Sequence, residues 1–269
     1  MLIAQITDSH LRSDGVLLHD CIDTVTALAN AVDHVNRLDP PPDVVLATGD
    51  LADTGLEQDY ALLRRQLDRL AMPYFVIPGN HDERPAMHRA FADKGYFPAT
   101  DTFLHYVVES FPLRLIGLDT VIPGEIGGGL CPARLGWLAE RLAEAPERPT
   151  LIFMHHPPFA TGIRFMDQPP FEGAEALKDI LLRHAQVREV ICGHIHRAIH
   201  AAWAGTIVAV APSTAYQMPL AFRADQRFHL TGQPPAIALY LWQDESDMRG
   251  FHSVVGGPSA RRHPAGGRP

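Results

Sequence analysis

Residues 2–10 read LIAQITDSH, and this stretch decides the fold. Four of the five residues Leu2–Ile6 are apolar, which is typical of a strand buried on both faces of a sheet. Asp8, Ser9 and His10 follow at once, so polar side chains stand where the expected strand ends. The same order, an apolar run followed by a polar motif, recurs four more times along the chain.

Apolar runs alternate with segments of helical period through most of the sequence. The segment 19–38 has Ile22, Val25 and Leu28 at helical spacing, and the prolines at 40–42 end it. We expect further helices at residues 57–70, 84–94, 132–143 and 173–184. We expect further strands at residues 44–47, 74–77, 103–108, 113–118, 151–154, 189–192, 206–211, 237–242 and 250–255.

This alternation of strands and helices predicts an α/β protein whose sheet is covered by helices on both faces. The β-rich end of the chain, from residue 206 onward, indicates a second sheet. No repeat and no shift in composition marks a linker, so we expect one domain over residues 1–255. Residues 256–269 are rich in glycine, proline and arginine, and we expect them to form a disordered tail.

Composition narrows the function. The 269 residues include 23 Lys and Arg against 31 Asp and Glu, a net charge of −8. This balance argues against a nucleic-acid partner, because Lys and Arg supply affinity for phosphate backbones. It still permits a small anionic substrate, since bound metal ions reverse the local field. The three cysteines cannot form a disulfide framework.

The sequence also predicts a cytoplasmic protein with no membrane partner. Its cysteine usage is that of a reducing compartment. No apolar run approaches the ~18 residues that a membrane-spanning helix needs, and the first residues lack the basic and apolar regions of a signal peptide.

Five polar motifs each follow an expected strand. They are Asp8-Ser9-His10, Gly49-Asp50, Gly79-Asn80-His81-Asp82, His155-His156 and Gly193-His194-Ile195-His196. Ligand sites in open α/β sheets form at the carboxyl ends of strands. We therefore expect the motifs to meet at one edge, although they run from residue 8 to residue 196. Each motif is weak alone, and the ordered set is a strong signal.

The side chains in these motifs are carboxylates, an amide and imidazoles, which suit first-row divalent metals. Seven candidate ligands result: Asp8, His10, Asp50, Asn80, His155, His194 and His196. Seven are too many for one ion that keeps an open position. They predict two metals that share a bridging carboxylate, about 3.5–4 Å apart, an arrangement used for in-line displacement at phosphorus. Without metals, such a cluster would cost several kcal/mol in poorly paired buried groups.

The ordered motifs resemble the signature of the calcineurin-like metallophosphoesterases: D-x-H, G-D, G-N-H-[DE], H and G-H-x-H. Motif positions and the run His155-His156-Pro157-Pro158 are similar to one branch, the bacterial class III cyclic-nucleotide phosphodiesterases and glycerophosphodiesterases. The resemblance covers about residues 1–215. The protein Ser/Thr phosphatase branch carries Asp-Arg-Gly after its Gly-Asp and Glu after Gly-Asn-His. Leu51-Ala52-Asp53 and Asp82 stand at those places, so that branch is not indicated.

The resemblance implies a four-layer α/β/β/α sandwich with two mixed sheets. It implies that one metal is held by Asp8, His10 and His196, the other by Asn80, His155 and His194, and both by Asp50. A hydroxide held by the metals would attack phosphorus. Asn80 and His81 would contact the substrate, and His81 would stabilise developing charge or protonate the leaving oxygen. Asp82 would orient its neighbour.

The implied activity is hydrolysis of small phosphodiesters, with 3′,5′-cyclic nucleotides, and cAMP first, as substrates. Glycerophosphodiesters are the second choice, because the same branch contains enzymes for them. The metals would be Fe, Mn, Co or Zn, since mixed Asp, Asn and His ligation accepts each. By analogy with the branch, the protein would form a homo-oligomer, a dimer or larger.

Several alternatives stay open at this point. His156 is either a partner that holds a ligand or a structural residue, and Cys192 is expected to fill the core. The aromatic and methionine side chains of the long segments 157–173 and 212–235 either stack on a nucleobase or pack the loops. A binding module without catalysis would be expected to lose ligands, and all seven are present. A nuclease is disfavoured by the net charge.

Overall fold

The computed structural model describes residues 1–100, 102–223, 225–244 and 247–256. Apart from Gly256, the tail expected at residues 256–269 lies outside the described residues. Across the described residues, no helix combines the length and the apolar character needed to cross a membrane.

The first sheet has five strands in the order β11-β10-β1-β2-β3. Its parallel strands are β1 (Leu2–Ile6), β2 (Val44–Thr48) and β3 (Tyr74–Ile77). The antiparallel hairpin of β10 (Ala236–Asp244) and β11 (Asp247–Val254) adds to β1. A late segment of the chain thus pairs with the first strand, which makes the sheet mixed.

The second sheet has six strands in the order β4-β5-β6-β7-β9-β8. β5, β6, β7 and β9 are parallel, and β4 and β8 are antiparallel edge strands. Their bounds are Tyr106–Val108 for β4, Arg114–Leu118 for β5, Thr150–Met154 for β6, Val187–Cys192 for β7, Ile199–Trp203 for β8 and Thr206–Val210 for β9.

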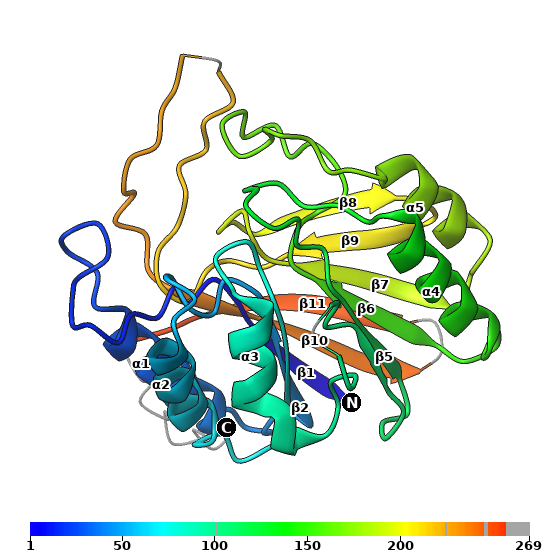
Figure 1. Cartoon of the computed structure of the whole chain (residues 1–269), viewed down its shortest axis with the longest axis horizontal. Coiled ribbons are helices and arrows are strands. Elements are labelled where there is room, and N and C mark those ends of the chain that lie inside the picture. The colour runs from blue at the N-terminus through cyan, green and yellow to red at the C-terminus, as the bar shows by residue number, and fades with distance from the viewer. Residues whose placement is uncertain (101, 224, 245–246, 257–269) are drawn as a thin grey trace, which may run out of the picture.

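Helices cover the outer face of each sheet (Figure 1). The first sheet carries α1 (Thr24–Asn36), α2 (Glu57–Leu67) and α3 (Arg84–Phe91), with a short 3₁₀ turn at Ala92–Lys94. The second sheet carries α4 (Pro132–Ala143) and α5 (Ala174–Leu182). The predicted α/β/β/α sandwich is confirmed.

Two apolar clusters hold these four layers together. Successive residues of a strand face opposite sides, so Val45 and Ala47 pack against α1–α3 while Val44 and Leu46 face the second sheet. The cluster that contains Val44 also reaches Leu138 of α4. The five residues of β2 are all buried, as the apolar sequence of the strand predicts.

The clearest differences from the expected elements are two late starts and one missed strand. The helix expected from residue 19 begins at Thr24, because Asp23 caps it by accepting a 3.0 Å hydrogen bond from the Thr26 amide. The strand expected from residue 103 begins at Tyr106. The strand β8 was not predicted, because an edge strand with polar and exposed positions such as His200 lacks a continuous apolar run.

Candidate metal centre

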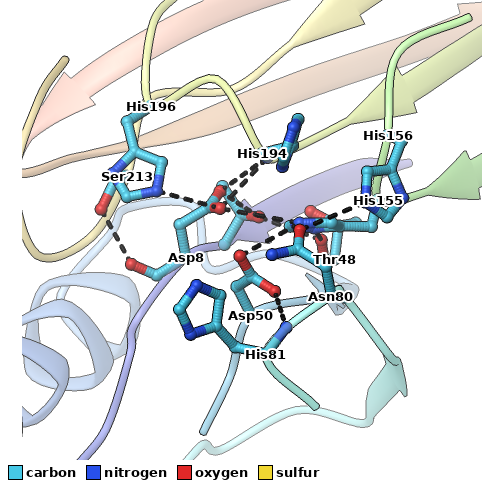
Figure 2. Close-up of polar contacts among 12 residues, drawn as sticks. Asp8, Thr48, Asp50, Asn80, His81, His155, His156, His194, His196 and Ser213 are labelled. Carbon is cyan, nitrogen blue, oxygen red and sulfur yellow. Dashed lines mark hydrogen bonds and ion pairs between the residues drawn. The ribbon is translucent and has the colours of Figure 1, made fainter. Parts of the chain in front are cut away.

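The predicted ligands lie together where five strands end between the two sheets: Figure 2 shows six of them, and His10 lies 3.2 Å from His196. Asp8 and His10 follow β1, Asp50 follows β2 and Asn80 follows β3. From the second sheet, His155 follows β6, while His194 and His196 follow β7. The predicted meeting of the motifs at one edge of the fold is therefore what the structure shows.

The backbone at these motifs is unusual. Five of the seven residues adopt left-handed conformations, with φ of 53° at Asp8, 42° at His10, 49° at Asp50, 70° at His194 and 51° at His196. A residue with a Cβ is strained there, by about 1–3 kcal/mol, and such strain gathers at functional sites. The turns thus bring side chains inward at an energetic cost that packing elsewhere offsets.

Glycine is required in these motifs because neighbouring atoms lie too close to leave room for a Cβ. A Cβ at Gly79 would lie 2.3 Å from Oδ1 of Asp50, and one at Gly193 would lie 2.1 Å from Oγ1 of Thr7. Neither neighbour can move away without displacing a candidate ligand, since Thr7 Oγ1 also donates a 2.7 Å hydrogen bond to Asp8 Oδ2. Glycine at these positions therefore lets the strand ends pack within ligand distance.

Hydrogen bonds outside the cluster fix the orientation of two imidazoles. Nδ1 of His155 donates to the carbonyl oxygen of Thr48 (2.8 Å), and Nδ1 of His196 donates to the carbonyl oxygen of Tyr216 (3.0 Å). A carbonyl only accepts, so each Nδ1 carries a proton, and in the neutral imidazole each Nε2 carries a lone pair. This is the arrangement typical of histidines that bind metal through Nε2.

The Nε2 atoms converge on the same space as the carboxylates. Nε2 of His10 lies 3.2 Å from Nε2 of His196, which lies 3.2 Å from Oδ1 of Asp8. Nε2 of His155 is buried and has no hydrogen-bond partner among the described residues, although Oδ2 of Asp50 lies 3.3 Å away. Lone pairs that face one another repel unless a cation lies between them. The donor set therefore suits metal ions.

Among the described residues, four groups of three donors are compact enough to hold an ion, and two of them, His155 with His156 and His194, and His10 with Asp53 and His81, include a residue outside the seven. In the other two groups, the ligand atoms of Asp8, His10 and His196 lie within 4.8 Å of one another, as do those of Asp8, Asp50 and His155. Asp8 belongs to both groups, and Oδ2 of Asp50 lies 3.8 Å from Nε2 of His10. The two groups are thus adjacent.

The electrostatics favour anionic carboxylates within the cluster. Burial by itself would raise the pKa of Asp50, but His155, His81 and His10 overcome it and hold this pKa well below the usual range. Burial opposes a higher pKa at His155 too, yet Asp50 raises it to about 9. Burial and the charge of His155 lower the pKa of His194 to about 3.

His81 is the exposed member of the site, with 42% of its side chain accessible. Its backbone amide donates a 2.8 Å hydrogen bond to Oδ1 of Asp50, and its Nδ1 lies 3.1 Å from the carbonyl oxygen of Asp53. Burial opposes protonation, but the hydrogen bond to Asp53 and the charge of Asp50 raise the pKa of His81 to about 10. Its Nε2 is the nitrogen left for a bound molecule.

His156 contacts Asn80, which favours one of the open alternatives. Its Nε2 donates to Oδ1 of Asn80 and to the carbonyl oxygen of Ile126, both at 3.2 Å. Its Nδ1 therefore accepts from the hydroxyl of Thr120, 2.8 Å away. His156 is thus the partner of a candidate ligand, in line with the first of the two alternatives.

Asp82 does not orient its neighbour His81. Its Oδ2 accepts from the amides of Leu51 and Gly79 (3.1 and 2.9 Å), and its Oδ1 accepts from the amide of Ala52 (3.1 Å) and the hydroxyl of Tyr60 (3.0 Å). Burial and the charge of Asp50 raise the pKa of Asp82 to about 6. Asp82 therefore clamps the loops after β2 and β3 to each other.

Sequence reasoning missed the residues that support the candidate ligands. Asp53 had the clearest signal, a carboxylate three residues after Asp50 in the motif Gly49-Asp50-Leu51-Ala52-Asp53. Ser213, whose hydroxyl donates to the carbonyl oxygen of Asp8 (2.8 Å), and Thr120 gave none. Cys192 lies fully buried in the core, as expected.

Residues 1–198 match the profile of the calcineurin-like phosphoesterases. The chain belongs to this family. The phosphoesterase is 37% identical over 257 residues to the "probable glycerophosphodiester phosphodiesterase GpdQ" of Arcobacter nitrofigilis. The alignment covers 95% of this chain and 94% of the relative. It is 33% identical over 219 residues to the "3′,5′-cyclic adenosine monophosphate phosphodiesterase CpdA" of Escherichia coli K12, over 80% of this chain and 76% of that protein.

Solved structures of the same architecture agree with the fold of this phosphoesterase. A dimetal phosphatase from Danio rerio superposes with a TM-score of 0.68 at 16% identity, over 95% of this chain and 99% of that one. A purple acid phosphatase from yellow lupin gives 0.69 at 13% identity, over 96% of this chain and 52% of the lupin chain. At these identities the likeness concerns the fold alone.

Proposed function

We propose that the protein is a metal-dependent phosphodiesterase that hydrolyses small phosphodiesters, with 3′,5′-cyclic nucleotides, cAMP first, as its substrates. The observation that carries the proposal is the convergence of the Nε2 atoms of His10, His155 and His196 on two buried carboxylates. Membership of the calcineurin-like phosphoesterases and the relative named as a cAMP phosphodiesterase support it. The 37% identical relative makes glycerophosphodiesters the second candidate class.

In this proposal, each metal has its own ligands and shares one. Asp8, His10 and His196 hold one ion, and Asn80, His155 and His194 hold the other. Asp50 would be shared by the pair, and its Oδ2 lies 3.3 Å from Nε2 of His155 and 3.8 Å from Nε2 of His10. We propose Fe, Mn, Co or Zn, because this mixed donor set accepts each of them.

The chemistry divides between the metals and the side chains. Bound metals of this kind polarise a phosphoryl oxygen and bring the pKa of coordinated water close to neutrality. Asn80 and His81 lie beside the position of the phosphate and orient it. Nδ1 of His81 donates toward Asp53, and the raised pKa of His81 favours the imidazolium, in which Nε2 carries a second proton that stabilises charge or passes to the leaving oxygen.

The same proposal covers the rest of the molecule. We propose that residues 1–255 form one domain, because one apolar cluster contains side chains from both sheets. We also propose that the protein is cytoplasmic, that it forms a homo-oligomer and that it does not bind nucleic acid.

The test combines metal analysis with activity. The protein loaded with Mn, Fe, Co or Zn is assayed on bis(p-nitrophenyl) phosphate, cAMP and glycerophosphoethanolamine. Asp50→Ala and Asn80→Ala are compared with Asp179→Ala, which removes an exposed carboxylate on α5. About two metals per chain, with hydrolysis lost in the two site variants alone, supports the proposal. No metal and no hydrolysis would favour a binding module, and the best diester identifies the substrate class.

A further inference from the structure

A pocket of about 200 Å³ lies directly beside the candidate metal centre. His156 and His194 form its inner wall, and the segment that follows β6 forms most of the rest, with the first residue of α5, Ala174. Phe159, Met166 and Phe171 contribute apolar side chains to it. Its position against His194 places it next to the proposed site of the phosphate.

Two polar side chains of the pocket, Asp167 and His156, are already bonded to the protein. Asp167 is its one carboxylate, and its Oδ1 accepts from the amide and hydroxyl of Thr161 while its Oδ2 accepts from the amide of Gly162, all at 2.8 Å. Both ring nitrogens of His156 are engaged by Thr120, Asn80 and the Ile126 carbonyl. A hydroxyl entering the pocket would therefore give up its hydration without gaining partners from these groups.

The pocket is preformed. The same hydrogen bonds that occupy Asp167 close the loop on itself, and Ile163 of this loop is buried in the apolar core. At the far end, the Glu172 amide donates to the carbonyl oxygen of Gly128 and the Leu130 amide donates to that of Glu172, both at 2.9 Å. A substituent that enters would not have to order the loop first, which favours binding.

We infer that this pocket receives a flat, apolar substituent of the phosphodiester, an aromatic ring such as a nucleobase. The inference rests on the proposed function and deepens it. Pockets that hold whole drug-sized ligands measure about 300–1,000 Å³, so this one takes a single ring. Phe159 and Phe171 provide aromatic surfaces for it. A glycerol moiety, with two hydroxyls to hydrate, is the poorer occupant.

Two opposite changes test the inference. Ala174→Phe fills the pocket, and Phe171→Ala removes an aromatic wall; neither is a candidate ligand. Phe251→Ala, an exposed phenylalanine on β11, is the matched control. The substrates are cAMP and bis(p-nitrophenyl) phosphate, which carry rings, and glycerophosphoethanolamine, which carries none. Calorimetric affinity for AMP, compared with glycerol 3-phosphate, adds a readout that does not depend on turnover.

For each ring-bearing substrate we expect kcat/KM to fall by about tenfold in both pocket variants, the size of a lost aromatic contact. Glycerophosphoethanolamine should change by less than about twofold, and AMP should lose affinity while glycerol 3-phosphate does not. Equal losses on every substrate, or none, would overturn the inference while the proposed function stands. Absence of hydrolysis in the unaltered protein would instead remove the proposed function on which it rests.

Discussion

Oδ1 of Asp53 lies 3.2 Å from Nδ1 of His10. The same oxygen lies 3.4 Å from Nδ1 of His81, and Oδ2 accepts a 3.0 Å hydrogen bond from Arg12. Burial opposes a low pKa at Asp53, but the hydrogen bonds from the two histidines hold it below its usual range. One carboxylate therefore orients a candidate metal ligand and the exposed histidine of the site together.

This arrangement predicts the result of Asp53→Asn. An amide accepts less strongly and can turn its NH₂ toward the imidazole, so His10 should lose its fixed tautomer. We expect metal affinity to fall by roughly 10–100-fold, the usual effect of removing the partner of a histidine ligand. Titration with Mn²⁺ or Zn²⁺ measures it. Asp14→Asn is the control, because Asp14 also bonds Arg12 but neither histidine. Equal affinity in both variants would contradict the prediction.

A second prediction concerns the chain of hydrogen bonds from Thr120 through His156 to Asn80. The Thr120 hydroxyl fixes the proton of His156 on Nε2, which in turn holds the amide oxygen of Asn80. In Thr120→Val and His156→Phe, we expect Asn80 to be free to rotate its amide. One of the two metals should then bind about tenfold more weakly, or more, while the other is unaffected.

The two variants separate positioning from structure. Metal stoichiometry at increasing free metal gives the two affinities, and thermal unfolding of the metal-free proteins reports the fold. If Thr120→Val binds both metals with the affinities of the unaltered protein, the hydrogen bonds from Thr120 through His156 do not hold Asn80 in place. If His156→Phe melts far below Thr120→Val, the role of His156 is structural.

The meeting of the five motifs was predictable because it depends on features that the sequence carries directly. Apolar runs identified the strands, and the carboxyl ends of parallel strands share an edge. The left-handed turns at Asp8 and Asp50 were not predictable, since nothing in the local sequence distinguishes a strained aspartate from an ordinary one. They persist because packing imposes them.

The supporting residues show the same limit more sharply. The Nδ1 atoms of His155 and His196 donate to backbone carbonyls of Thr48 and Tyr216. Every residue has a carbonyl, so no side-chain pattern marks these partners. The segment expected as helix from residue 19 failed for a related reason, because the capping geometry of Asp23 competes with apolar periodicity that continues on its N-terminal side.

Metal removal should destabilise the protein. A ligand that binds the folded state at 100 times its Kd adds about 2.7 kcal/mol to the free energy of unfolding. For a chain of this length each kcal/mol moves Tm by roughly 2–4 °C. We therefore expect a chelator to lower Tm by about 5–10 °C, as measured by scanning calorimetry. Asp50→Ala should respond little, and an equal response in that variant would contradict a centre that depends on Asp50.

The last prediction concerns Glu189, which is 5% exposed on β7, the strand that leads to His194 and His196. Burial raises its pKa to about 8, so the folded protein holds this proton at neutral pH, whereas the unfolded chain releases it near 4.5. The folded state binds the extra proton between these values, and the free energy of unfolding therefore falls as pH rises, by at most about 1.4 kcal/mol per unit.

Glu189→Gln keeps the shape of the side chain and removes the titration. We would measure urea unfolding with chelator present at pH 5, 6.5 and 8. The free energy of unfolding of the variant should increase relative to that of the unaltered protein as pH rises. For Glu175→Gln, on the exposed face of α5, the free energy of unfolding should depend on pH as it does in the unaltered protein. The same pH dependence in Glu189→Gln would show that burial does not raise the pKa of Glu189.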